Sequence, residues 1–188
     1  VEAIAEAAHD RTLLLHLDGA RIWNASLASG RTPATLCAPV DSVSACFSKG
    51  LGAPVGSVLA GDTDFITRAH RYRKMLGGGM RQAGILAGAC LHALDHHVER
   101  LADDHQNART LAQMLSTIDG LRCDPTQVET NIVMFEVKSL GAPDFVALAA
   151  DKGVKLAAID RGRVRAVTHL DVSSANIREA AQRLSTLI

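Results

Sequence analysis

The sequence of 188 residues has few aromatic side chains, 3% of the total, and no excess charge of either sign. Its 20 basic and 20 acidic residues leave a formal net charge of zero at pH 7. Without a basic excess there is no overall field to attract nucleic acids or anionic membranes, and with few aromatic rings there is little surface on which bases could stack. The composition therefore argues against nucleic-acid binding and against attachment to a membrane surface.

Cysteines and long apolar runs are scarce as well. The four cysteines contain no Cys-x-x-Cys pair, and they are interpreted as reduced, small apolar residues of a cytoplasmic protein. His92 and His96 lie four residues apart, but no carboxylate lies in register with them, so no metal site is predicted. No stretch approaches the ~18 consecutive apolar residues that a membrane-spanning helix requires.

Two short apolar runs in the first third of the chain each end at one ionisable residue that a glycine follows directly. The first run ends at Asp18 and the second at Lys49. Because an isolated buried charge is costly, a buried strand holds its charges at its rim, where a ligand can meet them. Pyridoxal phosphate requires an acid that keeps its pyridine nitrogen protonated and a lysine that forms an imine with its aldehyde. The pattern predicts that both residues face this one ligand.

Ordinary structural interpretations of the same residues remain open at this point. Asp18 precedes Gly19 in a dipeptide that is common in turns, and Lys49 could be an exposed lysine after a strand. The glycines at 50, 52 and 56 are typical of a phosphate-binding loop only in part, because their spacing is not Gly-x-Gly-x-x-Gly. A dinucleotide site is therefore not predicted.

Four motifs occur in a fixed order along most of the chain. They are HLDGAR at 16–21, SKGLGAPVGS at 48–57, RKMLGGGMRQ at 73–82 and VRAVTHLDV at 164–172. All four resemble the low-specificity L-threonine aldolases of the beta-eliminating lyase/threonine aldolase family, which are fold-type-I pyridoxal-phosphate enzymes. The resemblance covers the C-terminal half of that family. We therefore expect an N-terminal segment of the same enzyme to complete the protein.

The pattern of apolar residues predicts an α/β fold. Short buried strands at 12–17, 41–47 and 56–60 are followed by a helix to about Lys74 and a helical stretch at 82–118. After Gly120, strands at 131–137, 154–158 and 164–169 alternate with two helices, which is typical of a small α+β domain. The resemblance implies that 1–120 is the C-terminal part of an aspartate-aminotransferase-like (fold type I) large domain and that 121–188 is a small C-terminal domain. Segment 24–39 is expected to be a loop with at most a short helical turn.

The resemblance also implies roles for individual residues. Lys49 would hold the cofactor, and Asp18 would keep its ring nitrogen protonated. Arg21 and Arg165 are the expected partners of the substrate carboxylate, which a planar guanidinium can bind through two parallel hydrogen bonds. Arg161 and Arg163 lie close enough to Arg165 to compete for that assignment. Each arginine could instead belong to an exposed ion pair.

Two further basic residues, Lys74 and Arg81, flank the triple glycine of the third motif. The resemblance implies that they lie at a subunit contact near the cofactor phosphate, in a homo-oligomer that is a dimer or a tetramer. A solvated helix end would explain Lys74 almost as well, because a cation is favourable there.

The implied reaction is pyridoxal-phosphate-dependent aldol cleavage of L-threonine, L-allo-threonine and related β-hydroxy-α-amino acids to glycine and an aldehyde such as acetaldehyde. A β-eliminating lyase, racemase or aminotransferase of the same fold would need the same acid and lysine, so it remains an alternative. The other alternative is a catalytically incomplete fragment that serves as an assembly module.

Overall fold

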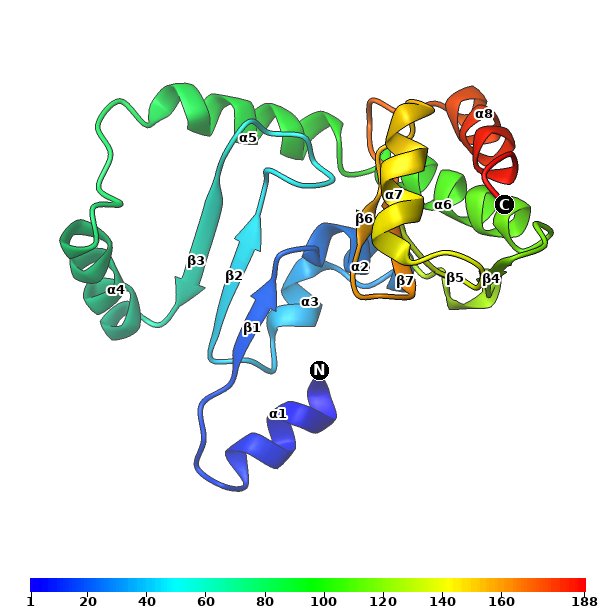
Figure 1. Ribbon diagram of the computed structural model, residues 1–188. Helices are drawn as coiled ribbons and strands as arrows, with labels where there is room; N and C mark the ends of the chain where they lie inside the picture. The colour runs from blue at the N-terminus through cyan, green and yellow to red at the C-terminus, as the bar shows by residue number, and fades with distance from the viewer. The chain divides into compact units, whose positions relative to one another are not determined.

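The computed structural model describes all residues, 1–188, and divides the chain into two compact units (Figure 1). Unit 1 comprises Val1–Glu99 and unit 2 comprises Arg100–Ile188. No helix of the structure combines the length and the apolar character needed to cross a membrane.

Unit 1 is built on a three-stranded sheet of order β1-β2-β3, in which β1 and β2 are parallel and β3 is antiparallel to β2. Asp41 links the starts of the two parallel strands, because its Oδ2 accepts the Leu15 N–H at 2.7 Å and also contacts His9 Nε2 at 2.9 Å. The hydrogen bond from Leu15, with that of His9, holds the pKa of Asp41 below its usual value. In chain order the elements are α1 (Glu2–His9), β1 (His16–Gly19), α2 (Ile22–Ser29), α3 (Pro33–Cys37), β2 (Ser42–Cys46), β3 (Ser57–Gly61), α4 (Thr63–Met75) and α5 (Gly84–His96).

Unit 2 is built on an antiparallel sheet of order β4-β5-β7-β6 whose apolar face is covered by three helices. Residues alternate along β5, so that Val133, Phe135 and Val137 are buried while Met134 points to the other face. The buried face meets Leu115 of α6. Its elements are α6 (Leu101–Leu115), β4 (Leu121–Cys123), the 3₁₀ turn η1 (Pro125–Gln127), β5 (Ile132–Val137), α7 (Ala142–Asp151), β6 (Ala157–Ala158), β7 (Arg163–Val167) and α8 (Ser174–Ser185).

The predicted elements are largely present, and their ends follow the expected local signals. The Asp62 side chain caps α4 by accepting the Phe65 N–H at 2.7 Å, and Gly77 follows the helix with φ +80°. Ser173 and Asn176 form a capping box at the start of α8. Unit 1 is α/β and unit 2 is α+β, as the apolar pattern predicted.

Four features differ from the sequence prediction. The segment expected to be a loop contains α2 and α3, and β4 was not predicted. The helical stretch at 82–118 is two helices, α5 and α6. The division between the compact units lies at Glu99–Arg100 instead of near Gly120, because α6 buries Leu111 and Leu115 in the core of unit 2.

A buried ion pair at the start of α6 provides a stability prediction. Arg100 holds the completely buried carboxylate of Asp104 through two contacts, at 2.6 and 3.3 Å. Arg100→Leu leaves that charge buried without a partner, so we expect it to lower the free energy of unfolding by roughly 3–5 kcal/mol. Arg122→Leu is the matched control, since the Arg122–Glu136 pair is exposed and is worth about 1 kcal/mol or less. Urea denaturation of the full-length protein measures both, and equal losses in the two variants would contradict the prediction.

Candidate active site

The ends of the two parallel strands of unit 1 lie at the same edge of the sheet. Asp18 is opposite Ser44 in the β1–β2 register, and Lys49 follows shortly after β2 ends at Cys46. Because β1 and β2 run in the same direction, both residues are at the carboxyl edge, where ligands of open α/β sheets bind. The structure therefore brings the predicted acid and the predicted lysine to one edge.

Asp18 has a carboxylate oxygen to spare. The side chain is exposed, and its Oδ1 accepts the Ala20 N–H at 3.0 Å, while Oδ2 makes no hydrogen bond. The following Gly19 is required by packing, since a Cβ there would lie 2.7 Å from the Ser44 carbonyl oxygen. His16, on the same face of β1, is tied to Ser42 Oγ through its Nδ1 at 2.8 Å. Asp18 is thus fixed by its backbone and remains open to a ligand.

Lys49 lies in a tight loop, residues 47–53, which we call the Lys49 loop. The loop is closed by hydrogen bonds from Ala53 N to Phe47 O, at 3.0 Å, and from Gly52 N to Lys49 O, at 2.9 Å. Leu51, 1% exposed, anchors it in the interior. The Lys49 side chain is exposed and makes no hydrogen bond or ion pair. The backbone of this lysine is held while its amine is left free to react.

Trp23 supports the end of β2, a role that the sequence analysis missed. Its Nε1 donates to the Cys46 carbonyl oxygen at 3.0 Å, and its ring stacks on Phe47 with centroids 5.9 Å apart. The signal that could have found it is composition, because Trp23 is the single tryptophan of a chain with few aromatic residues. This contact comes from the start of α2, a helix that lies mostly within the segment 24–39 expected to be a loop.

The two predicted carboxylate-binding arginines lie in different units. Arg21 is the N-cap residue of α2 in unit 1, directly after the Asp18 strand, and it is half-buried. Arg165 is in β7 of unit 2, opposite Met134 of β5. Its Nε is buried and has no hydrogen-bond partner. A buried donor without an acceptor is costly, so this guanidinium is suited to an anionic ligand.

The structure separates Arg165 from its competitor Arg163. The Arg163 Nε donates to Asp160 Oδ2 at 2.6 Å, so that guanidinium is already paired. The backbone hydrogen bond from Gly162, together with the two bonds from Arg163, lowers the pKa of Asp160 to about 2. The carboxylate therefore stays charged at neutral pH and keeps Arg163 occupied.

Lys74 and Arg81 are not joined to the other predicted site residues. Lys74 is exposed in the last turn of α4, where its stem runs beside Gly79. Arg81 is exposed in the connection from α4 to α5. No hydrogen bond or ion pair links either residue to Asp18, Arg21 or Lys49. α4 also begins at the opposite edge of the sheet from Asp18 and Lys49. It follows the antiparallel β3, whose last residue, Gly61, pairs with the first residue of β2, Ser42.

Comparison with known proteins finds a family and relatives that match most of the chain. Residues 1–139 match the family model described as beta-eliminating lyase. The chain is 44% identical over 177 residues to the low specificity L-threonine aldolase of Escherichia coli (strain K12). This match covers 94% of the chain and 51% of that protein. The chain thus spans about half the length of the curated relatives that it matches.

Solved structures share the fold. The Leishmania major threonine aldolase superposes with a TM-score of 0.75 at 20% identity, over 99% of this chain and 55% of the other. The structure of SPT with PLP superposes with a TM-score of 0.71 at 18% identity, over 97% of this chain and 49% of the other. The predicted fold type I is confirmed by these neighbours.

Proposed function

Because the chain belongs to the beta-eliminating lyase family, we propose that the protein is a pyridoxal-phosphate enzyme that cleaves L-threonine and related β-hydroxy-α-amino acids to glycine and an aldehyde. The observation that carries the proposal is the meeting of Asp18 and Lys49 at the carboxyl edge of the β1–β2 pair. The relative with 44% identity, named a low specificity L-threonine aldolase, supports this reaction over others of the same fold.

The free groups at this edge fit the cofactor. Lys49 offers an amine that makes no hydrogen bond or ion pair, and Asp18 offers a carboxylate oxygen with no partner. Pyridoxal phosphate, when bound, supplies an electron sink for the pair released as a bond to Cα breaks. Asp18 would hold the proton on the ring nitrogen, since an ionised carboxylate favours the charged form of a neighbouring base. The amine of Lys49 would hold the cofactor covalently.

The arginines orient the substrate. Arg165 has a buried Nε without an acceptor, and a substrate carboxylate would supply one. Arg21 is the second candidate for that carboxylate. Fixing the carboxylate also fixes which bond to Cα is aligned for cleavage, and such positioning lowers the barrier to reaction.

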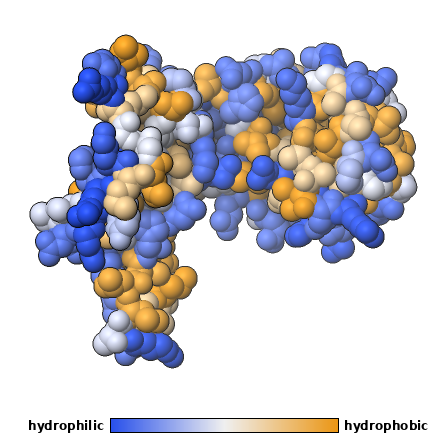
Figure 2. Space-filling model, turned by 60° about the vertical axis from the view of Figure 1, so that its left-hand side comes forward, coloured by the Kyte–Doolittle hydropathy of each residue, from blue (hydrophilic) through white to orange (hydrophobic).

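Lys74 and Arg81 are proposed to serve a cofactor phosphate across a subunit contact of a homo-oligomer. Both side chains are exposed and unpaired, so they are available to a partner. The same segment carries exposed large hydrophobic residues, among them Tyr72, Met75 and Leu76. Figure 2 shows hydrophobic side chains, in orange, at several places on one face of the molecule. Exposed apolar patches of this kind are typical of interaction sites.

The sheet of unit 1 is proposed to be completed by a segment equivalent to the other half of the relatives. Every residue of β3 is exposed, including Val58 and Leu59, and Leu13 and Leu14 beside β1 are exposed as well. A strand edge and an apolar face left open in this way are unfavourable in water. The chain's coverage of about half of its relatives is consistent with such a segment.

The function is tested by product analysis. We expect the full-length protein with pyridoxal phosphate to convert L-threonine to glycine and acetaldehyde in equal amounts, measured by amino-acid chromatography and by a coupled alcohol dehydrogenase assay. The 188-residue chain alone is expected to release neither product. 2-Oxobutyrate and ammonia in place of glycine and acetaldehyde would instead indicate β-elimination of the threonine hydroxyl, the chemistry that the family description also allows.

A further inference from the structure

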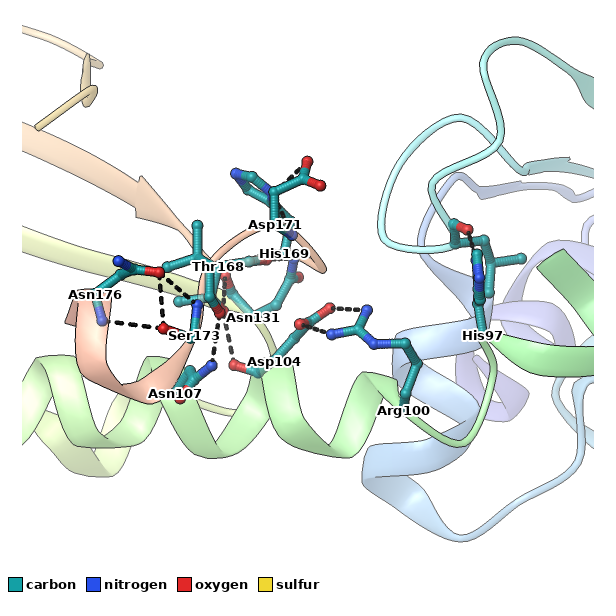
Figure 3. Close-up of polar contacts among 12 residues, drawn as sticks. His97, Arg100, Asp104, Asn107, Asn131, Thr168, His169, Asp171, Ser173 and Asn176 are labelled. Carbon is teal, nitrogen blue, oxygen red and sulfur yellow. Dashed lines mark hydrogen bonds and ion pairs between the residues drawn. The ribbon is translucent and has the colours of Figure 1, made fainter.

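We infer that His97 is a positioning residue that sets the Lys49 loop for reaction. His97 Nδ1 lies 2.6 Å from the carbonyl oxygen of Leu51, 46 residues earlier in the chain. A carbonyl oxygen can only accept, so the imidazole N–H donates. Figure 3 shows His97 at the end of α5 with its ring directed toward this loop. No other side chain hydrogen-bonds to residues 48–53.

The position of the His97 ring is fixed by α5. His97 is the C-cap residue of this helix, and its backbone N–H donates to the Ala93 carbonyl oxygen at 2.9 Å. The neighbouring His92 ring packs edge-on against it, with centroids 5.3 Å apart. Cys90, on the same helix, leaves no room for a Cβ at Gly56, which would lie 2.8 Å from its sulfur. The end of α5 therefore packs against the segment that follows β2 and carries Lys49.

The hydrogen bond from His97 reaches the Lys49 loop at a residue that lies between two glycines. Leu51 lies between Gly50 and Gly52, two residues with little conformational restriction of their own. A buried carbonyl without a donor is costly, and here the only donor from outside the loop is His97. The hydrogen bond orients the Leu51 peptide, which in turn fixes the backbone of Lys49 two residues before it. The amine itself stays free, as a covalent attachment to the cofactor requires.

The inference rests on the proposed function for the role of Lys49, but the anchoring of the loop does not. It is tested with four variants of the full-length enzyme. His97→Leu removes the donor, and His97→Asn keeps an amide N–H at the position of Nδ1. His97→Gln places its amide one bond farther away, and His96→Leu is the control, since the exposed His96 makes no bond to the loop.

The first readout needs no cofactor. Amide hydrogen exchange in the cofactor-free protein reports on Gly52 and Ala53, whose N–H groups close the loop. We expect exchange at these amides to be about tenfold faster in His97→Leu and His97→Gln, and within about threefold of wild type in His97→Asn and in the control.

The second readout is the rate at which added pyridoxal phosphate becomes attached to Lys49, trapped with borohydride and measured by peptide mass spectrometry. We expect about tenfold slower attachment in the Leu and Gln variants and recovery in the Asn variant. Attachment at the wild-type rate in His97→Leu overturns the inference, even if exchange is faster, because the contact is then only structural.

Should His97→Leu fail to fold, the comparison of Asn with Gln decides, and equal rates in those two variants overturn the inference. A wild-type enzyme that attaches no cofactor at Lys49 overturns the proposed function and the positioning role with it. The exchange results from the cofactor-free protein identify that case, since they decide independently whether His97 anchors the loop.

Discussion

Lys49→Ala in the full-length enzyme is expected to abolish threonine cleavage while leaving the fold intact. The amine of Lys49 is the proposed point of covalent attachment, and no other lysine lies in the loop or in β1 and β2. The side chain is exposed and makes no hydrogen bond or ion pair. Its removal should therefore change stability by no more than about 0.5 kcal/mol.

The loss is measured by the visible absorbance of the lysine-bound cofactor, by acetaldehyde release and by thermal unfolding. We expect the absorbance and the activity to disappear and the melting temperature to stay within about 2 °C of wild type. Lys138→Ala is the matched control, since Lys138 is also exposed but follows β5 in unit 2. A variant that retains activity and carries borohydride-trapped cofactor on another lysine would show that Lys49 is not the attachment point.

The strand ends show how much of the site could be predicted from the sequence. A charge at the rim of an apolar run is a local signal, because the cost of burying it applies to each strand separately. Asp18 and Lys49 were singled out on that basis, and β1 and β2 are indeed parallel neighbours. The end of α4 near Lys74 was also predicted from the sequence, and the helix ends at Met75. The roles of Asp18 and Lys49 in binding a cofactor remain predictions.

The features that could not be predicted depend on contacts between distant residues. α2 lacks a side-chain N-cap and has little amphipathic pattern, so its sequence alone does not indicate a helix. The structure shows what holds it, the hydrogen bond from Trp23 to the Cys46 carbonyl oxygen. The hydrogen bond of His97 to Leu51 spans 46 residues. The place of α6 in unit 2 follows from its packing with α8 and β5, which its own sequence does not specify.

Arg163 and Arg165 of β7 also show that the sequence does not specify which partners a side chain has. In the sequence the two arginines are equivalent, because they lie two residues apart and so share a face of β7. The structure distinguishes them by their partners. Asp160 is close to Arg163 through the turn before β7 and pairs with it, whereas the buried Nε of Arg165 has none.

Arg165→Ala is therefore expected to lower kcat/KM for L-threonine about ten- to a hundredfold. A hydrogen bond to a charged group contributes roughly 1.5–3 kcal/mol, and this one is proposed to bind the substrate carboxylate and to align the bond that breaks. We expect KM to rise and kcat to fall, since alignment is lost together with binding. Steady-state kinetics of the full-length variant measures both constants.

Stability separates this role from a structural one. Because the buried Nε of Arg165 has no partner within the protein, truncation removes no protein hydrogen bond from it and relieves an unsatisfied buried donor. Arg165→Ala should thus unfold at the wild-type temperature or slightly above it, while activity falls. Arg163→Ala breaks the exposed pair with Asp160 and should leave kcat/KM within about twofold of wild type. If the kinetic loss appeared in Arg163→Ala and not in Arg165→Ala, the substrate carboxylate would be bound by Arg163, and the Asp160 pair would have to open to admit it.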